Sequence, residues 1–89
     1  MEKLPRKRSK LEIYLDVLKV IRKGVHKPTK IMYTTNLSWN PLMNILDSLI
    51  SQNLIIQNYN RKHSIYEITD KGREVLTYFS KALQEIDIS

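Results

Sequence analysis

Residues 54–69, with the sequence LIIQNYNRKHSIYEIT, constrain the fold more than any other stretch of this chain. Two runs rich in β-branched and aromatic residues, LIIQNY and IYEIT, flank the polar segment NRKHS. Runs of this kind on either side of a short polar segment predict a β-hairpin. The segments before and after it carry helical signals, so we expect the hairpin to be part of a mainly helical domain.

The residues before the hairpin predict three helices. Ser9 and Glu12 match a capping box at the start of a first helix, which runs to about Lys23 and ends at a glycine. Its polar stripe is narrow, which predicts burial on more than one side and a central position in the domain. A short second helix begins at residues 27–29 and ends at Asn36, a residue that tolerates the left-handed conformation.

The third helix follows at once. Ser38 is its expected cap, Pro41 falls in the first turn, where its missing N–H needs no partner, and Asn53 is the expected terminator. Apolar residues recur with helical spacing and form the expected buried face: Leu42, Ile45, Leu46, Leu49 and Ile50. The expected outer face comprises Asn40, Met43, Asn44, Asp47, Ser48 and Ser51.

After the hairpin, Thr69 and Asp70 suit the start of a last helix that runs to about Ile88. The order is therefore three helices, a hairpin and a helix, which predicts a mainly α fold with a β-hairpin (α+β) of the winged helix-turn-helix type. We divide the chain into a flexible basic N-terminal arm (1–9), a winged helix-turn-helix domain (10–69) and a C-terminal helix (70–89) that is a candidate dimerisation element.

The sequence lacks the signs of a catalytic or metal site. It has no cysteine, and its histidines, His26 and His63, are too far apart to form a recognisable ligand pair. We find no phosphate-binding loop and no nucleophile with its base. We therefore expect no enzymatic activity, cofactor or metal, and no small-molecule effector is evident. No run is long enough to span a membrane and nothing resembles a signal peptide, so we expect a cytoplasmic, nucleoid-associated protein.

The positive charge of the chain is unevenly distributed. The net charge is +6, and ten of the fifteen Lys and Arg residues lie within residues 1–30. Residues 31–60 contain no Lys or Arg, and their only formal charge is Asp47. Arg61 and Lys62 follow in the hairpin turn. This distribution favours a polyanion as the partner. The simpler interpretation is that the charge only keeps a small protein soluble.

Four pieces of the sequence resemble a known group of proteins: KLEIYLDVLKVIRKG, KPTKIMYTTNLSW, LDSLISQNLI and YEITDKGREVL, which cover nearly all of residues 10–78. They resemble the small archaeal winged helix-turn-helix proteins, some of which are transcription regulators and some chromatin-associated. The resemblance implies DNA binding, with the third helix in the major groove and the hairpin as a wing. In some relatives a longer last helix pairs two subunits as an antiparallel coiled coil.

The sequence departs from this group at two positions. The group often has a basic residue near the middle of the third helix, where this chain has Asn44, and a glycine before the first wing strand, where it has Asn53. Asparagine tolerates the left-handed conformation, so we expect the fold to be kept at Asn53. Asn44 removes a positive charge from the helix that the resemblance implies is the DNA-reading helix.

Binding to double-stranded DNA would divide the work between two sets of residues, because phosphate contacts supply affinity and base contacts supply sequence choice. The expected phosphate contacts are Arg6, Lys7, Arg8, Lys27, Lys30, Arg61 and Lys62. The expected base contacts are Asn40, Asn44 and Ser48, since an asparagine can bond adenine in the major groove. The alternative for both sets is an ordinary solvated surface. The rival function is a winged helix that contacts proteins and does not bind DNA.

The apolar pattern of the last helix predicts that two chains assemble. Four apolar residues alternate by threes and fours and form a coiled-coil-like seam: Leu76, Phe79, Leu83 and Ile86. The seam lasts only about two heptads, fewer than the three or four that identify a coiled coil. We expect a homodimer built from the first and last helices. The alternative is that the same residues pack on their own domain.

Overall fold

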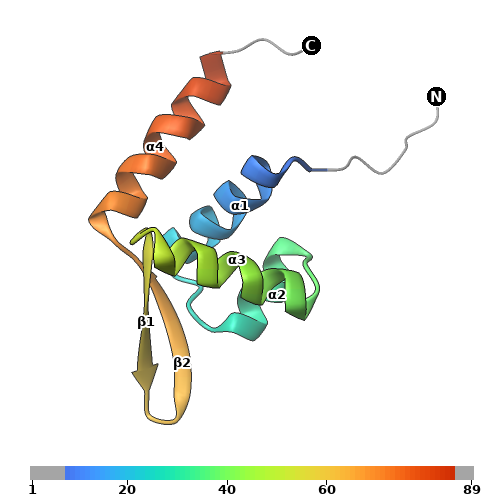
Figure 1. Cartoon of the computed structure of the whole chain (residues 1–89), viewed down its shortest axis with the longest axis vertical. Helices are drawn as coiled ribbons and strands as arrows, with labels where there is room; N and C mark the ends of the chain where they lie inside the picture. The colour runs from blue at the N-terminus through green and yellow to red at the C-terminus, as the bar shows by residue number, and fades with distance from the viewer. Residues whose placement is uncertain (1–7, 86–89) are drawn as a thin grey trace, which may run out of the picture.

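A computed structural model describes residues 8–85 of the chain. Three helices precede a two-stranded antiparallel hairpin, and a fourth helix follows it. The elements are α1 (Lys10–Arg22), α2 (Pro28–Thr35), α3 (Trp39–Ser51), β1 (Ile55–Asn60), β2 (His63–Ile68) and α4 (Asp70–Glu85). Figure 1 shows that the hairpin and α4 extend in opposite directions from the cluster formed by α1, α2 and α3. The element order confirms the predicted winged helix-turn-helix architecture.

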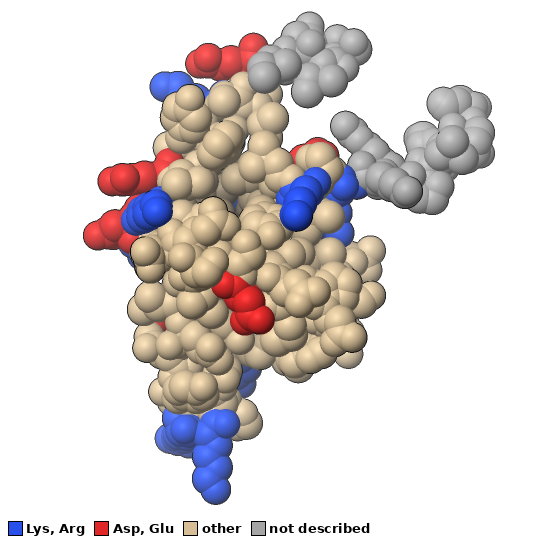
Figure 2. All heavy atoms as spheres, viewed as in Figure 1, with Lys and Arg blue, Asp and Glu red and all other residues tan. Residues whose placement is uncertain are grey.

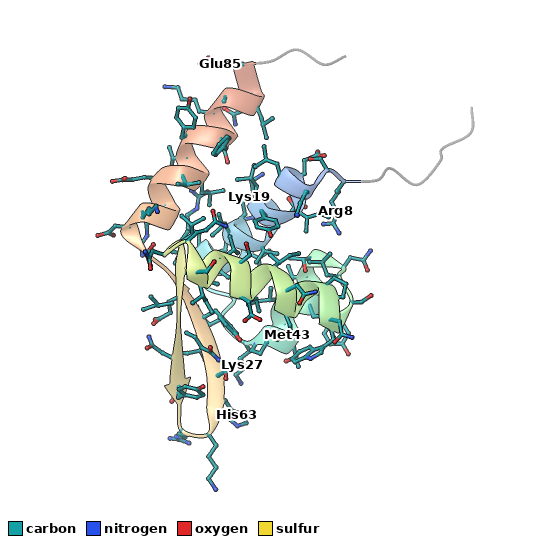
Figure 3. The ribbon with its side chains drawn as sticks, viewed as in Figure 1. Arg8, Lys19, Lys27, Met43, His63 and Glu85 are labelled. Atoms are coloured by element: carbon teal, nitrogen blue, oxygen red, sulfur yellow. The ribbon has the colours of Figure 1, made fainter. Side chains whose placement is uncertain are left out.

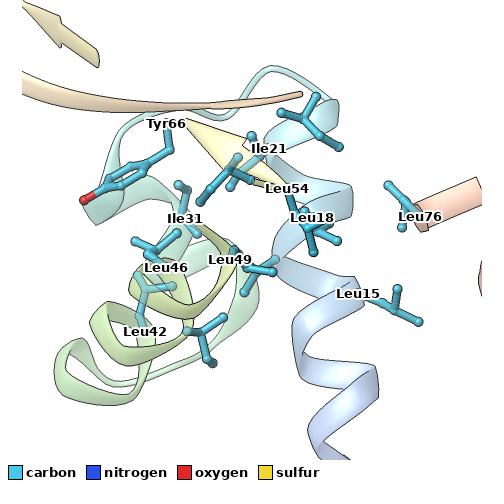
Figure 4. Packing of buried hydrophobic residues seen from close by; sticks show 14 residues of the cluster. Leu15, Leu18, Ile21, Ile31, Leu42, Leu46, Leu49, Leu54, Tyr66 and Leu76 are labelled. Carbon is cyan, nitrogen blue, oxygen red and sulfur yellow. The ribbon is translucent and has the colours of Figure 1, made fainter. Parts of the chain in front are cut away.

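Helix α1 begins with the predicted capping box. The backbone N–H of Glu12 donates to the Ser9 hydroxyl over 3.1 Å, and the backbone N–H of Ser9 donates to the Glu12 carboxylate over 2.9 Å. The helix packs against α2, β2 and α4, which confirms its central position. Its buried side chains all belong to the hydrophobic core, and Figure 4 labels three of them: Leu15, Leu18 and Ile21, with Val17 as the fourth.

The turn between α2 and α3 is built around Asn36. This residue has a φ of 59°, as the sequence predicted, and the following N–H of Leu37 donates to the carbonyl of Met32 over 3.1 Å. Ser38 occupies the N-cap position of α3, as predicted, although its side chain makes no cap hydrogen bond. Four of the five residues predicted for the inner face of α3 are buried, and Ile50 is half-buried.

The hairpin is tighter than the sequence suggested. The strands pair from Ile55 opposite Ile68 to Asn60 opposite His63, so only Arg61 and Lys62 remain in the turn. The predicted five-residue segment NRKHS is therefore too long, because the ladder continues through three of its residues. Arg61 takes a φ of 61°, a conformation that a two-residue turn requires of at least one residue.

The connection between α1 and α2 lies along the free edge of β2. The backbone N–H of Tyr66 donates to the carbonyl of His26 over 3.0 Å. In return, Nδ1 of His26 lies 2.7 Å from the carbonyl oxygen of Tyr66. Because a carbonyl oxygen only accepts, Nδ1 must carry the hydrogen and donate it. These two bonds hold the residues just before α2 against the wing.

The base of the wing is joined to the start of α4 by Thr69 and Gly72. The Thr69 hydroxyl accepts from the N–H of Gly72 over 2.9 Å, which caps α4 as predicted, and it donates to the carbonyl of Asn53 over 2.7 Å. Asn53 has the left-handed φ of 63° that the sequence allowed. A Cβ at Gly72 would lie 2.1 Å from the carbonyl oxygen of Leu54, so this close approach requires a glycine.

Helix α4 packs on α1. Leu76 has no exposed surface and completes the core beside α1 (Figure 4), whereas Phe79 and Leu83 are only partly buried against it. Leu76 therefore has no surface left to offer to a second chain. Ile86, the last member of the predicted seam, lies outside the described residues. No helix within residues 8–85 is long and apolar enough to cross a membrane.

Candidate nucleic-acid interface

The outer face of α3 is exposed and carries no positive charge. Asn40, Asn44 and Asp47 are exposed, and Ser48 is half-buried. Figure 2 shows this side of the molecule as a broad uncharged surface with an acidic side chain near its centre. Asp47 is the only acidic residue of α3. The helix therefore presents amides, hydroxyls and one carboxylate, which are groups that can hydrogen-bond base edges but that do not attract phosphate.

Ser48 is oriented differently from the two asparagines. Its hydroxyl lies 3.1 Å from the side-chain nitrogen of Gln52, which donates to it. Ser48 also lines a shallow hollow together with Leu11 and Tyr14 of α1. Ser48 thus borders α1 and is already hydrogen-bonded within the helix.

Tyr66 connects the wing to α3 beneath the surface. Its ring is 5% exposed and lies among the buried side chains of α2 and α3 (Figure 4). Burial raises the pKa of its hydroxyl above the ordinary value, and the negative charge of Asp47 raises this pKa further.

A groove lies between the start of α2 and the tip of the wing, and we call it the wing groove. Its part at the tip is a pocket of about 240 Å³, and a neighbouring hollow of about 330 Å³ extends it toward the α1–α2 connection. Figure 3 shows Lys27 and His63 near one another beside the wing. The lining residues are Gly24, Val25, His26, Lys27, Lys30, Asn60, Arg61, His63 and Ile65.

Three of the predicted phosphate-binding residues line the wing groove. Lys27 and Lys30 come from the N-cap and first turn of α2, and Arg61 comes from the hairpin turn. Lys62 is exposed beside Arg61 but does not line the groove. In Figure 2, positively charged side chains cover the tip of the wing. The fold thus brings together cations that are far apart in the sequence.

The N-terminal arm differs from expectation at Arg8. This residue was predicted to be part of a flexible arm, but its guanidinium lies 2.9 Å from the carboxylate of Asp16 on α1. The side chain is about one third exposed, and its charge is partly compensated by the pairing. Arg6 and Lys7 lie outside the described residues.

Three further polar residues line the wing groove but were not among the predicted phosphate contacts: His26, Asn60 and His63. His63 and Asn60 could have been found, because they flank the turn and face each other across the hairpin. His26 gave no such signal, since its position depends on hydrogen bonds to a residue forty positions later. Within residues 8–85, no three His, Asp or Glu side chains are grouped so that they could hold a metal ion.

Relatives of this chain occur in the archaeon Methanocaldococcus jannaschii. One uncharacterized protein is 33% identical over 69 residues, which are 78% of this chain and 67% of the relative. A second is 33% identical over 70 residues, which are 79% of this chain and 31% of the relative. The chain therefore spans about two thirds of one relative and less than one third of the other.

Solved structures share the fold. The DNA-binding protein Sso10a-2 from Sulfolobus solfataricus has a TM-score of 0.76 at 23% identity, over 86% of this chain and 80% of that protein. The transcriptional repressor CouR, bound to a 23-mer DNA duplex, has a TM-score of 0.76 at 22% identity, over 89% of this chain and 57% of the repressor. A family model described as winged helix-turn-helix matches residues 7–87. This chain belongs to the winged helix-turn-helix family.

Proposed function

We propose that this protein binds double-stranded DNA, as a transcriptional regulator or as a chromatin-associated protein acting at the nucleoid. The observation that carries this proposal is the wing groove. Lys27, at the N-cap of α2, lines both adjoining hollows of this groove, together with Arg61 of the wing in one and Lys30 of α2 in the other. Cations gathered from distant segments are suited to a backbone that carries a phosphate at every nucleotide.

The uncharged α3 is compatible with this function. Neutralisation of phosphates and release of their counterions supply affinity, and they do not need to occur on the helix that touches the bases. The exposed amides of Asn40 and Asn44 supply donors and acceptors suited to base edges. Ser48 is a weaker candidate for base contact, because its hydroxyl is already bonded to Gln52.

The comparisons support the proposal by analogy of fold. Sso10a-2 is described as a DNA-binding protein, and CouR was solved on a DNA duplex. Both are less than 25% identical to this chain, so they share its fold, and the proposed DNA contacts rest on this chain's own surface.

A second candidate function is a protein-binding module, and the surface around α3 favours it. Trp39 at the start of α3 is 45% exposed, and Tyr33 of α2 is 78% exposed. Exposed aromatic residues are suited to a protein partner. In this case the charge of the wing would serve solubility.

Salt dependence of binding to a random DNA duplex separates the two functions. If Lys27, Lys30, Arg61 and Lys62 each meet a phosphate, the logarithm of the affinity should fall against the logarithm of the salt concentration with a slope of about −3 to −4. Residues outside the described range would steepen the slope. No measurable binding at low salt would support the protein-binding module.

We further propose that α4 contributes to a homodimer. Its second half extends beyond the helical cluster (Figure 1), and Phe79 and Leu83 are only partly buried. Leu11 at the start of α1 is 43% exposed and adds apolar surface. Together these residues offer a seam that a second chain can cover.

Substitution of Phe79 by Asp tests the dimer. A buried unpaired carboxylate at the seam is costly, so Phe79→Asp should convert a dimer into a monomer in sedimentation at micromolar concentration. Thr77→Asp, at an exposed position of the same helix, is the matched control and should leave the dimer intact. A wild-type protein that sediments as a monomer at this concentration would reject the proposal.

A further inference from the structure

The wing groove is lined by hydrogen-bond donors and by apolar side chains, without an acidic residue. Lys27, Lys30 and Arg61 supply positive charge, Asn60 supplies an amide, and Ile65 supplies an apolar wall. Within residues 8–85 the salt bridges join Arg8 to Asp16 and Arg73 to Asp70, so none of them engages the three groove cations. The groove therefore holds a concentration of positive charge without an internal counterion among the described residues.

The shape of the groove is fixed by the backbone around it. The two hydrogen bonds between His26 and Tyr66 attach the residue before Lys27 to the middle of β2. Arg61 is held on the other side by the two-residue turn, with its φ of 61°. The segment before Lys27 is therefore anchored to β2, the strand that follows the turn containing Arg61.

The tip of the groove has room for a small anion. A water molecule occupies about 30 Å³ in the liquid, so a pocket of about 240 Å³ can hold a tetrahedral anion and part of its hydration shell. Arginine and lysine are the side chains that bind phosphate oxygens most strongly, the former through its planar fork and the latter as a point charge. His63 also lines this tip, beside Arg61.

We propose that the tip of the wing groove is a discrete binding site for one phosphate-type oxyanion, with Lys27 and Arg61 as its principal ligands. A free phosphate group can occupy this site without DNA. As an extension that rests on the proposed function, a phosphate of the DNA backbone occupies the same site in the complex. A free phosphate-type anion then competes with DNA at this point and lowers DNA affinity more than ionic strength alone.

The first experiment uses inorganic phosphate without DNA. Backbone amide signals are followed by NMR while phosphate replaces chloride at constant ionic strength and pH. We expect saturable, single-site shifts around residues 26–30 and 60–65. Shifts that do not saturate, or that are spread evenly over all exposed cations, would overturn the site.

Two variants and a matched control sharpen this measurement. Lys27→Gln removes a charge from a side chain that makes no cap hydrogen bond, and Arg61→Asn removes a charge while keeping a residue that tolerates a positive φ. Each should weaken phosphate binding by at least about tenfold, because each removes a charge-assisted hydrogen bond. Lys81→Gln, exposed on α4, should leave phosphate affinity unchanged. Equal effects of Lys27→Gln and Lys81→Gln would overturn the assignment.

The second experiment adds a DNA duplex and separates the two sources of phosphate. At constant ionic strength, phosphate should displace DNA more effectively than chloride does, and Lys27→Gln should abolish this difference. If phosphate binds saturably but does not compete with DNA in this way, the site binds free anions only. That result would overturn the claim that a DNA phosphate occupies the same site. Saturable phosphate binding by a protein that does not bind DNA supports the site and rejects the proposed function.

Discussion

The wing groove and the outer face of α3 differ in charge, and each is suited to a different kind of contact with DNA. The groove collects Lys27, Lys30 and Arg61 from two distant segments and has no acidic residue in its lining. The outer face of α3 carries exposed amides and the single carboxylate of Asp47. Attraction to a polyanion and hydrogen bonding to base edges are separable physical tasks, so the absence of charge on α3 does not by itself argue against DNA binding.

Both regions are held in place by contacts beneath the surface. Tyr66 of the wing is buried below α3, and its backbone is bonded to His26 just before α2. Thr69 and Gly72 attach the base of the hairpin to α4. The distance between the cationic and the uncharged region is therefore set by the packed core, and substitutions in that core should disturb both regions together.

The largest effect is expected from Gly72→Ala, which should disrupt the joint that holds the wing. Its Cβ would meet the Leu54 carbonyl oxygen at 2.1 Å, and a backbone atom cannot move aside as a flexible side chain can. We expect a loss of about 1–3 kcal/mol in the free energy of unfolding, measured in urea. Arg73 follows Gly72 in the sequence and is exposed. Arg73→Ala should therefore lower the free energy of unfolding by no more than about 0.5 kcal/mol. Equal costs would contradict the close approach at Gly72.

The next largest effect is expected from removing the positive charge of the wing turn, which should change the salt dependence of DNA affinity. Arg61→Asn combined with Lys62→Gln should flatten the plot of log affinity against log salt by about 1–2 units and weaken all duplex sequences alike. The double variant Arg73→Gln with Lys81→Gln removes the same charge from α4 and is the control. If both double variants change the slope equally, the wing has no special role and only net charge matters.

Adding a charge to α3 tests whether this helix faces DNA. Asn44 is exposed, so Asn44→Lys should be tolerated and should steepen the salt dependence by about 0.9 units if the helix lies against the phosphates bordering the major groove. Thr77→Lys adds the same charge to an exposed position of α4 and should leave the slope unchanged. An Asn44→Lys protein that behaves like the Thr77→Lys protein would place α3 away from the DNA.

The smallest expected effect is on the pH dependence of stability and comes from Tyr66, which lies beneath both regions. Burial first, and then the charge of Asp47, raise the pKa of its hydroxyl above the ordinary value near 10. Above that pH the unfolded chain loses this proton before the folded chain does, so the free energy of unfolding should fall as the pH rises. Tyr66→Phe should make this alkaline fall shallower. Tyr33→Phe, at a position that is 78% exposed, is the control and should change the slope less.

Much of the fold could be predicted because the decisive signals are local. The capping box at Ser9 and the left-handed turn at Asn36 each depend on a few neighbouring residues. The hairpin was predictable as an element, but its turn was not, because the ladder continued through polar residues that strand propensity disfavours. Ser38 was correctly predicted as the N-cap residue of α3, but residue type alone could not show that its hydroxyl makes no cap hydrogen bond.

The candidate site was predictable only in part. Charge clustering pointed to Lys27, Lys30 and Arg61, but nothing local indicated that they line one groove. That arrangement depends on the pairing of His26 with Tyr66, which is a contact between distant segments. The pairing of Arg8 with Asp16 was also not predictable, because the two residues are eight positions apart and meet only once α1 has formed.

The central claim is that an uncharged α3 and a cationic wing groove bind the same DNA. The most direct measurement is an NMR titration of the full chain with a short duplex at low salt, in which the amide signals of both regions are followed together. Signals around residues 27–30, 60–63 and the exposed positions of α3 should shift with one common affinity, while the exposed positions of α4 stay unchanged. Shifts confined to the wing groove, with α3 unaffected by any duplex, would contradict the claim.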